Sequence, residues 1–197
     1  MRLVFVGAAF VLLVLPAGAP TPLPSVPSAS SIDLKVALLS QGKCGRYADN
    51  LATLMSITGF QPGGRTATTV VCLRNTGGSR GQLSLGLIDL ASRDDACSPG
   101  EAAVDSSCGQ GLAGELQGRL AHETATLRRC DDEPGPFSST AFTSLATNPL
   151  SLGPIGANET RCIALRVAYS GGTANAEAAA QTDTVSWRYA FDLAQRQ

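Results

Sequence analysis

The chain has 197 residues, with 15 lysines and arginines against 16 aspartates and glutamates, so its formal net charge is −1. Recognition of nucleic-acid phosphates needs a basic stripe, which this nearly neutral sequence lacks, so we expect no nucleic-acid partner. Only 16% of the residues are charged, and glycine, serine, threonine and alanine are abundant, which favours an exported all-β domain over long, salt-bridged helices.

Residues 1–19 are predicted to be a signal peptide. Arg2 supplies a positive charge, and residues 3–15 follow without a polar side chain. This run is shorter than the about 20 apolar residues that span a bilayer, and Pro16 ends it. Cleavage after Ala19 fits the small residues there, while a site as late as residue 30 is the alternative. We expect a secreted or cell-surface protein with no stable membrane span after signal removal.

Residues 20–31 form a predicted flexible arm, because four prolines in twelve positions prevent a regular hydrogen-bond ladder. Residues 32–197 are then long enough for one domain with a single core. The alternation of apolar and polar residues at the start of 32–39 predicts a first strand, or a segment lent to a partner.

Two predictions concern the segments that follow. Residues 47–57 place Leu51, Leu54 and Met55 at helical spacing before a glycine, which predicts one short helix. Residues 66–87 predict a β-hairpin, since a strand rich in threonine and valine leads into an Asn-Thr-Gly-Gly turn and then into alternating leucines.

Residues 89–111 have the composition of a long loop with several acidic side chains. A calcium loop needs six or more oxygens at set spacing, and this segment has no order like that of an EF-hand. We therefore interpret the acidic residues as solvated, with a ligand-binding loop as the alternative. They are Asp89, Asp94, Asp95, Glu101 and Asp105.

The remaining elements are predicted strands. Residues 120–127 and 160–169 alternate in polarity, and Val185, Trp187, Tyr189, Phe191 and Leu193 share one parity in a closing strand. The asparagine of a glycosylation sequon at 158–160 is interpreted as a turn residue. Short strands without βαβ alternation predict an all-β fold, an antiparallel jelly-roll-like β-sandwich with one or two short helices and disulfides.

Six cysteines in an exported chain predict three disulfides. Fifteen pairings are allowed. The spacing suggests that Cys97 and Cys108 close a local loop and that Cys130 and Cys162 join neighbouring elements, which leaves Cys44 and Cys72. No two cysteines are closer than eleven positions, unlike the paired ligands of zinc sites. We expect no metal site and no cofactor.

A single histidine, His122, argues against an enzyme. The run His122-Glu123-Thr124-Ala125-Thr126 lacks the second histidine of a zinc protease motif, so we interpret His122 as a residue on a strand surface. The carboxylates of 131–133 are the alternative basis for a hydrolase, but no nucleophile has a motif-supported base. We expect no catalytic residue.

Three motifs occur in order. They are Phe60-Gln61-Pro62-Gly63-Gly64 leading to Arg74-Asn75-Thr76-Gly77, then Leu152-Gly153-Pro154-Ile155-Gly156-Ala157-Asn158-Glu159-Thr160, then Gln181-Thr182-Asp183-Thr184-Val185-Ser186-Trp187 with Phe191 and Gln195. Over residues 60–195 the chain resembles the TasA/camelysin family of bacterial exported surface and biofilm-matrix proteins, especially its cysteine-bearing actinobacterial branch. The resemblance implies a jelly-roll-like sandwich whose N-terminal segment adds as a strand to a neighbouring subunit.

The sequence thus leads to one functional hypothesis and one alternative. The hypothesis is a secreted structural or cell-surface protein, a matrix or fibre subunit that associates with itself or with other surface proteins. The alternative is a non-catalytic extracellular module that binds a protein, a glycan or a metal ion. Some proteins of the family carry a metalloprotease label, which a chain with one histidine and no zinc motif gives no reason to transfer.

Overall fold

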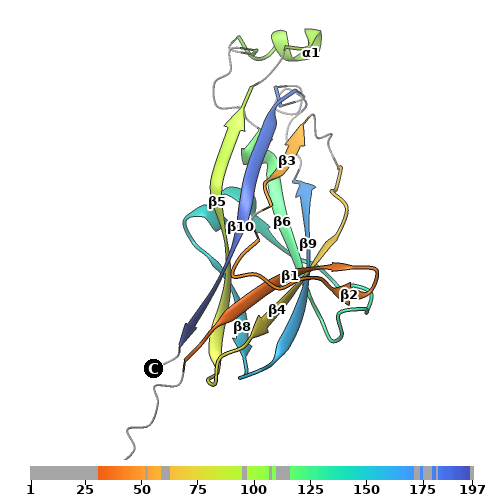
Figure 1. The fold of residues 1–197 in the computed structure, drawn as a ribbon. Helices are drawn as coiled ribbons and strands as arrows, with labels where there is room; N and C mark the ends of the chain where they lie inside the picture. The colour runs from red at the N-terminus through yellow and green to blue at the C-terminus, as the bar shows by residue number, and fades with distance from the viewer. Residues whose placement is uncertain are drawn as a thin grey trace, which may run out of the picture.

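The computed structural model describes most of the chain from residue 31 onward (Figure 1). The predicted signal peptide at 1–19 and all but the last residue of the arm at 20–31 lie outside the described residues. The described residues are 31–51, 53–58, 63–94, 97–106, 108–109, 116–170, 174, 179–180 and 182–195.

The described part is built from β-strands with three short helical segments. The strands are β1 (Leu34–Ser40), β2 (Lys43–Cys44), β3 (Met55–Thr58), β4 (Thr69–Asn75), β5 (Gly81–Arg93), β6 (Leu120–Leu127), β7 (Ser138–Ala141), β8 (Leu150–Ile155), β9 (Thr160–Tyr169) and β10 (Thr184–Gln195). The helical segments are α1 (Pro99–Ala102) and the 3-10 turns η1 (Leu116–Arg119) and η2 (Phe142–Ala146).

The strands form two antiparallel sheets. One has the order β2-β1-β4-β9-β6-β7, and the other has the order β3-β10-β5-β8. The chain passes from one sheet to the other at most of its connections, as the interleaved strand colours in Figure 1 show. This arrangement confirms the predicted antiparallel β-sandwich.

The core lies between the two sheets and is centred on β10. Trp187 is 1% exposed, and the ring of Phe142 meets it edge-on with 4.9 Å between centroids. The alternation predicted for the closing strand is confirmed, because its apolar side chains are buried while their neighbours are partly exposed. Such edge-to-face aromatic packing adds to the stabilisation from burial itself.

A second, smaller cluster covers the outer face of the six-stranded sheet. Its buried members are Ala37, Cys72, Ala125, Leu127, Cys162 and Ala164, and Phe137 packs against them. The guanidinium of Arg166 lies 3.8 Å from the centre of the Phe137 ring and completes this cover. The central strands β4, β6 and β9 are therefore buried on both faces, which explains why β9 is almost continuously inaccessible.

The helix predicted over 47–57 is wrong. Ala48 instead makes an isolated bridge to Val36, and β3 pairs with the first residues of β10, with Met55 opposite Trp187. Met55 and Ile57 are two residues apart and contribute to the core on the same side of the strand. Pairing with a strand more than a hundred residues away decides the structure here, not the local spacing.

The hairpin predicted over 66–87 is also wrong, although both of its strands exist. β4 pairs with β1 and β9, whereas β5 pairs with β10 and β8, so the connection between them is a corner that joins the two sheets. Asn75 holds this corner. Its amide nitrogen donates to the carbonyls of Ser79 (2.6 Å) and Gly156 (3.0 Å), and its amide oxygen accepts from the backbone N–H of Gly77 (3.0 Å).

Replacing Asn75 should test this role. The side chain is fully buried, so Asn75→Ala leaves two carbonyls and one N–H without their partner, and we expect the free energy of unfolding to fall by about 2–3 kcal/mol. Urea denaturation of the oxidised protein measures the change. Asn148→Ala removes an exposed amide and serves as the control. Equal midpoints for the two variants would contradict the assignment.

Candidate functional site

Three acidic residues meet at one end of the sandwich. β5 ends at Arg93 and β10 begins at Thr184, and these two residues are opposite each other in the ladder. The next residues outward, Asp94 and Asp183, therefore lie at the same end of the two strands. α1 follows β5 and supplies Glu101. Figure 1 shows α1 beyond the ends of β5 and β10, far from the C-terminus.

The three carboxylates are buried and close together. Asp94 is 3% exposed, Glu101 is fully buried and Asp183 is 1% exposed. One carboxylate oxygen from each lies within 4.8 Å of those of the other two. We call Asp94, Glu101 and Asp183 the carboxylate cluster.

Backbone and hydroxyl donors fix one oxygen of each carboxylate. The N–H of Gly109 donates to Asp94 Oδ1 (2.8 Å), and the N–H of Leu116 donates to Asp183 Oδ2 (2.9 Å). Glu101 Oε2 accepts from the Ser98 N–H (3.2 Å) and from the Thr182 hydroxyl.

Local sequence explains how Glu101 reaches this position. Ser98 begins α1 as its N-cap, and its hydroxyl accepts from the Glu101 N–H at 3.2 Å. Pro99 occupies the first helical position, where no N–H is needed. The reciprocal bonds between Ser98 and Glu101 form a capping box, so the same carboxylate that belongs to the cluster also anchors the helix start.

Two carboxylate oxygens remain without a donor. Asp94 Oδ2 and Glu101 Oε1 are buried and accept no hydrogen bond in the part of the chain that the structure describes. Ionised carboxylates this close repel one another, and burial away from water makes their charge costly. A cation bound between these carboxylates would relieve both costs.

The structure corrects the interpretation of the acidic segment as a solvated loop. Asp94 and Glu101 are buried, and β5 extends to Arg93, over the first five residues of the segment predicted to be loop. Asp89 does lie on the surface, where it pairs with Arg188 at 2.8 Å. Asp105 is half-buried, and its backbone N–H bonds the carbonyl of Glu101. Asp95 lies outside the described residues.

Sequence reasoning missed Asp183. In the sequence it stands in a motif before the closing strand, and 82 positions separate it from Glu101. The signal that identifies it is the register of the β5–β10 ladder, which no local pattern reveals.

All six cysteines are in disulfides, paired Cys44–Cys72, Cys97–Cys108 and Cys130–Cys162. This is the pairing that the spacing suggested. The Cys97–Cys108 bridge closes the loop that carries Glu101, next to the carboxylate cluster.

The other two bridges lie side by side on the outer face of the six-stranded sheet. Cys72 and Cys162 are directly opposite on β4 and β9, and all four sulfur atoms lie within 4.8 Å of one another. Sulfur binds zinc as thiolate, and these sulfurs are held in disulfides. The two disulfides therefore join β2 to β4 and the turn after β6 to β9. We call this pair of disulfides the double staple.

His122 is on a strand, as predicted, but the prediction that it lies on the strand surface is wrong. It is fully buried on the inner face of β6, and its ring meets Tyr189 of the opposite sheet edge-on with 5.4 Å between centroids. Burial lowers the pKa of His122 from 6.5 to about 4, and the neighbouring Glu123 carboxylate opposes this only in part. His122 is therefore a neutral core residue.

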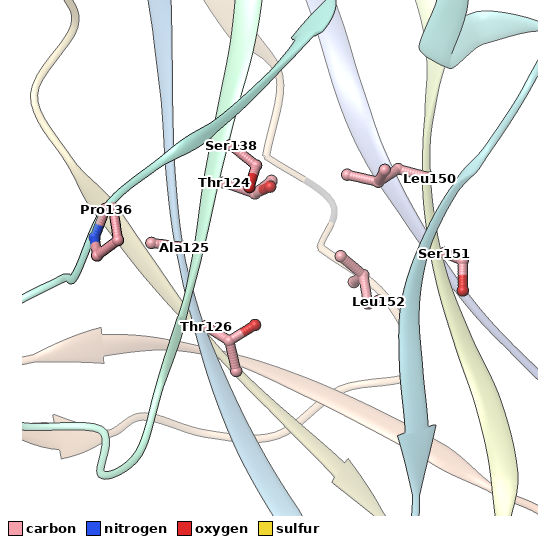
Figure 2. Close-up of a pocket in the computed structure, with 8 residues that line it drawn as sticks. All are labelled: Thr124, Ala125, Thr126, Pro136, Ser138, Leu150, Ser151 and Leu152. Atoms are coloured by element: carbon pink, nitrogen blue, oxygen red, sulfur yellow. The ribbon is translucent and has the colours of Figure 1, made fainter.

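A pocket of about 230 Å³ opens where the edges of the two sheets face each other, between β6 and β7 on one side and β8 on the other (Figure 2). Figure 2 shows Leu150 and Leu152 directed from β8 toward Thr124, with Ser151 directed away. The lining consists of hydroxyl and apolar side chains, without an acid, a base or a thiol: Thr124, Ala125, Thr126, Pro136, Ser138, Leu150, Ser151 and Leu152.

The carboxylates considered for a hydrolase lie in the turn after β6. Asp131 pairs with Arg129 at 3.3 Å, and Asp132 accepts the Arg129 N–H at 2.9 Å. Both stabilise the turn and neither lines the pocket of Figure 2.

Comparison with protein-family models, with curated proteins and with solved structures finds no match for this chain. Among the residues that the structure describes, no helix has the length and apolar character needed to cross a bilayer.

The buried histidine predicts a pH dependence of stability. An unfolded chain protonates its histidine near pH 6.5, whereas the folded chain resists this until about pH 4. The stability conferred by a neutral His122 is thus complete above pH 6.5 and is lost as the pH falls to 4, by about 3 kcal/mol. His122→Leu should remove this part of the loss, as measured by urea denaturation from pH 7 to pH 4. Parallel curves for variant and wild type would refute the prediction.

Proposed function

We propose that this protein is an exported, non-catalytic structural protein of the cell surface or extracellular matrix. The observation that carries the proposal is the double staple on the outer face of a sandwich whose six cysteines are all bridged. Disulfides persist in oxidising compartments and are rare in the cytoplasm, and the N-terminal apolar run of the sequence points to the same destination.

The absence of an assembled catalytic group in the described residues supports a non-catalytic role. The single histidine is buried in the core, and the carboxylates of 131–133 that the structure engages are used in a turn. The pocket between the sheet edges offers hydroxyls and leucines but no base to activate them.

Self-assembly by strand addition is part of the proposal. β3 pairs with β10 only over Thr184–Trp187, whereas β10 continues to Gln195 with β5 on its other side. Beyond Trp187 that edge is a place where an extended segment can add. Figure 1 shows the start of β1 near the end of β10, so the described part of the chain begins close to this edge. We propose that the arm of a second copy occupies it.

Removing the arm tests the assembly. The exported wild type should be found on the cell surface or in the medium with all six cysteines unreactive to alkylation, and it should form oligomers or fibres as its concentration rises. A chain that begins at Ser31 should keep the same melting temperature and stay monomeric, because the donated segment is gone. Light scattering after size exclusion, together with electron microscopy, gives the readout.

Two outcomes would overturn the proposal. A wild type that stays monomeric at every concentration would exclude assembly, and cysteines that react with alkylating agents inside cells would exclude export. A truncated chain that still assembles like the wild type would assign the assembly to another surface.

A further inference from the structure

We propose that the carboxylate cluster of Asp94, Glu101 and Asp183 is a binding site for a divalent cation with a preference for oxygen ligands, namely calcium. This inference does not rest on the structural role proposed above, because it concerns a different end of the molecule. It is carried by burial, charge and the orientation of the carboxylates.

Positive side chains are scarce in the segments around the cluster. None of the ion pairs between described residues involves Asp94 or Glu101. From Asp94 to Gly118 the sequence has five acidic residues and no lysine, arginine or histidine, and residues 170–187 add two acidic residues and no basic one. Apart from Arg93, the exposed last residue of β5, these segments bring no positive group of their own, and a cation from solution can neutralise the buried carboxylates.

The hydrogen bonds around the cluster suit metal ligands. A donor holds one oxygen of each carboxylate and leaves Asp94 Oδ2 and Glu101 Oε1 as acceptors without a donor. Outer hydrogen bonds of this kind fix the orientation of ligating carboxylates in metal sites.

The donor set points to calcium. All the ligand atoms are oxygens, whereas zinc prefers nitrogen and sulfur, and magnesium retains several waters in a strict octahedron. Two oxygens that both bind one calcium at 2.3–2.6 Å are at most about 5 Å apart, and the oxygens of the cluster lie within 4.8 Å of one another. Three carboxylates supply three to six ligands, and water or backbone carbonyls would complete the shell.

A bound cation would join three segments of the chain. It would link the end of β5, the helix α1 and the start of β10, next to the Cys97–Cys108 bridge. We therefore expect calcium to stabilise the fold and to order this end of the sandwich.

Calorimetry and thermal unfolding of the purified, oxidised protein test the site. Titration of the chelator-treated protein with CaCl₂ should show one calcium bound per chain. Calcium at 100 times its dissociation constant should raise the melting temperature by about 5–10 °C. Magnesium at the same concentration should have a smaller effect, and zinc should not compete.

Two variants and one matched control locate the site. Glu101→Gln and Asp183→Asn should each weaken calcium binding at least tenfold, and Asp89→Asn, which changes an exposed carboxylate of the same acidic segment, should bind like wild type. In EGTA the two cluster variants should melt at or above the wild-type temperature, because each removes one repelling charge. This arm shows that the variants fold.

Several results would overturn the inference: no calcium heat and no change in melting temperature, equal binding by Asp89→Asn and by the cluster variants, or a cluster variant that melts below wild type in EGTA. A chain that binds calcium but neither assembles nor leaves the cell would sink the proposed function alone. A chain that assembles on the cell surface without binding calcium would sink this inference alone.

Discussion

The pairing of β5 with β10 is the constraint on which the rest of the molecule depends. Its register runs from Gly81 opposite Gln195 to Arg93 opposite Thr184, with one irregularity between Ser186 and Arg188. Along its length β10 presents Trp187 and its neighbours to the core, so the ladder fixes the aromatic centre of the sandwich. At its outer end the same ladder holds Asp94 and Asp183 together, so packing and the candidate site share one framework.

The outer face of the six-stranded sheet is partly buried, although a sandwich normally exposes its outer faces to water. Here small side chains and two disulfides cover the outer face of β4 and β9, and Cys72 and Cys162 are opposite each other in the ladder. Alanines and cysteines bury little apolar area each, so burial alone contributes modestly there. The bridges compensate by restricting the unfolded chain, with loops of 28 and 32 residues. On this face two disulfides therefore take the place of a larger hydrophobic cluster.

Local patterns were sufficient for strands whose side chains obey one periodicity. The bounds predicted for 120–127 and 160–169 agree with β6 and β9.

Local patterns failed where pairing with a distant strand decides the structure of a segment. The leucines near 51–55 have helical spacing, yet β10 recruits Met55 into a strand. The Asn-Thr-Gly-Gly signal did mark a reversal of the chain, but turn chemistry does not say which sheet each strand joins, and Asn75 holds a corner. The alternating pattern around His122 predicts a surface position, but this strand is buried on both faces.

Local sequence patterns could not predict the carboxylate cluster either. An EF-hand gathers its ligands within twelve residues, so a motif can reveal it. In this protein Asp94 and Glu101 lie in one segment, and Asp183 reaches them only through the register that sets Thr184 opposite Arg93. The only sign of the cluster in the sequence is its composition, because the residues from Asp94 to Gly118 include acidic side chains and no basic one. Such a stretch is ordinary when it is solvated. The fold buries two of these carboxylates together with Asp183, and this placement distinguishes the proposed cation site from an ordinary acidic loop.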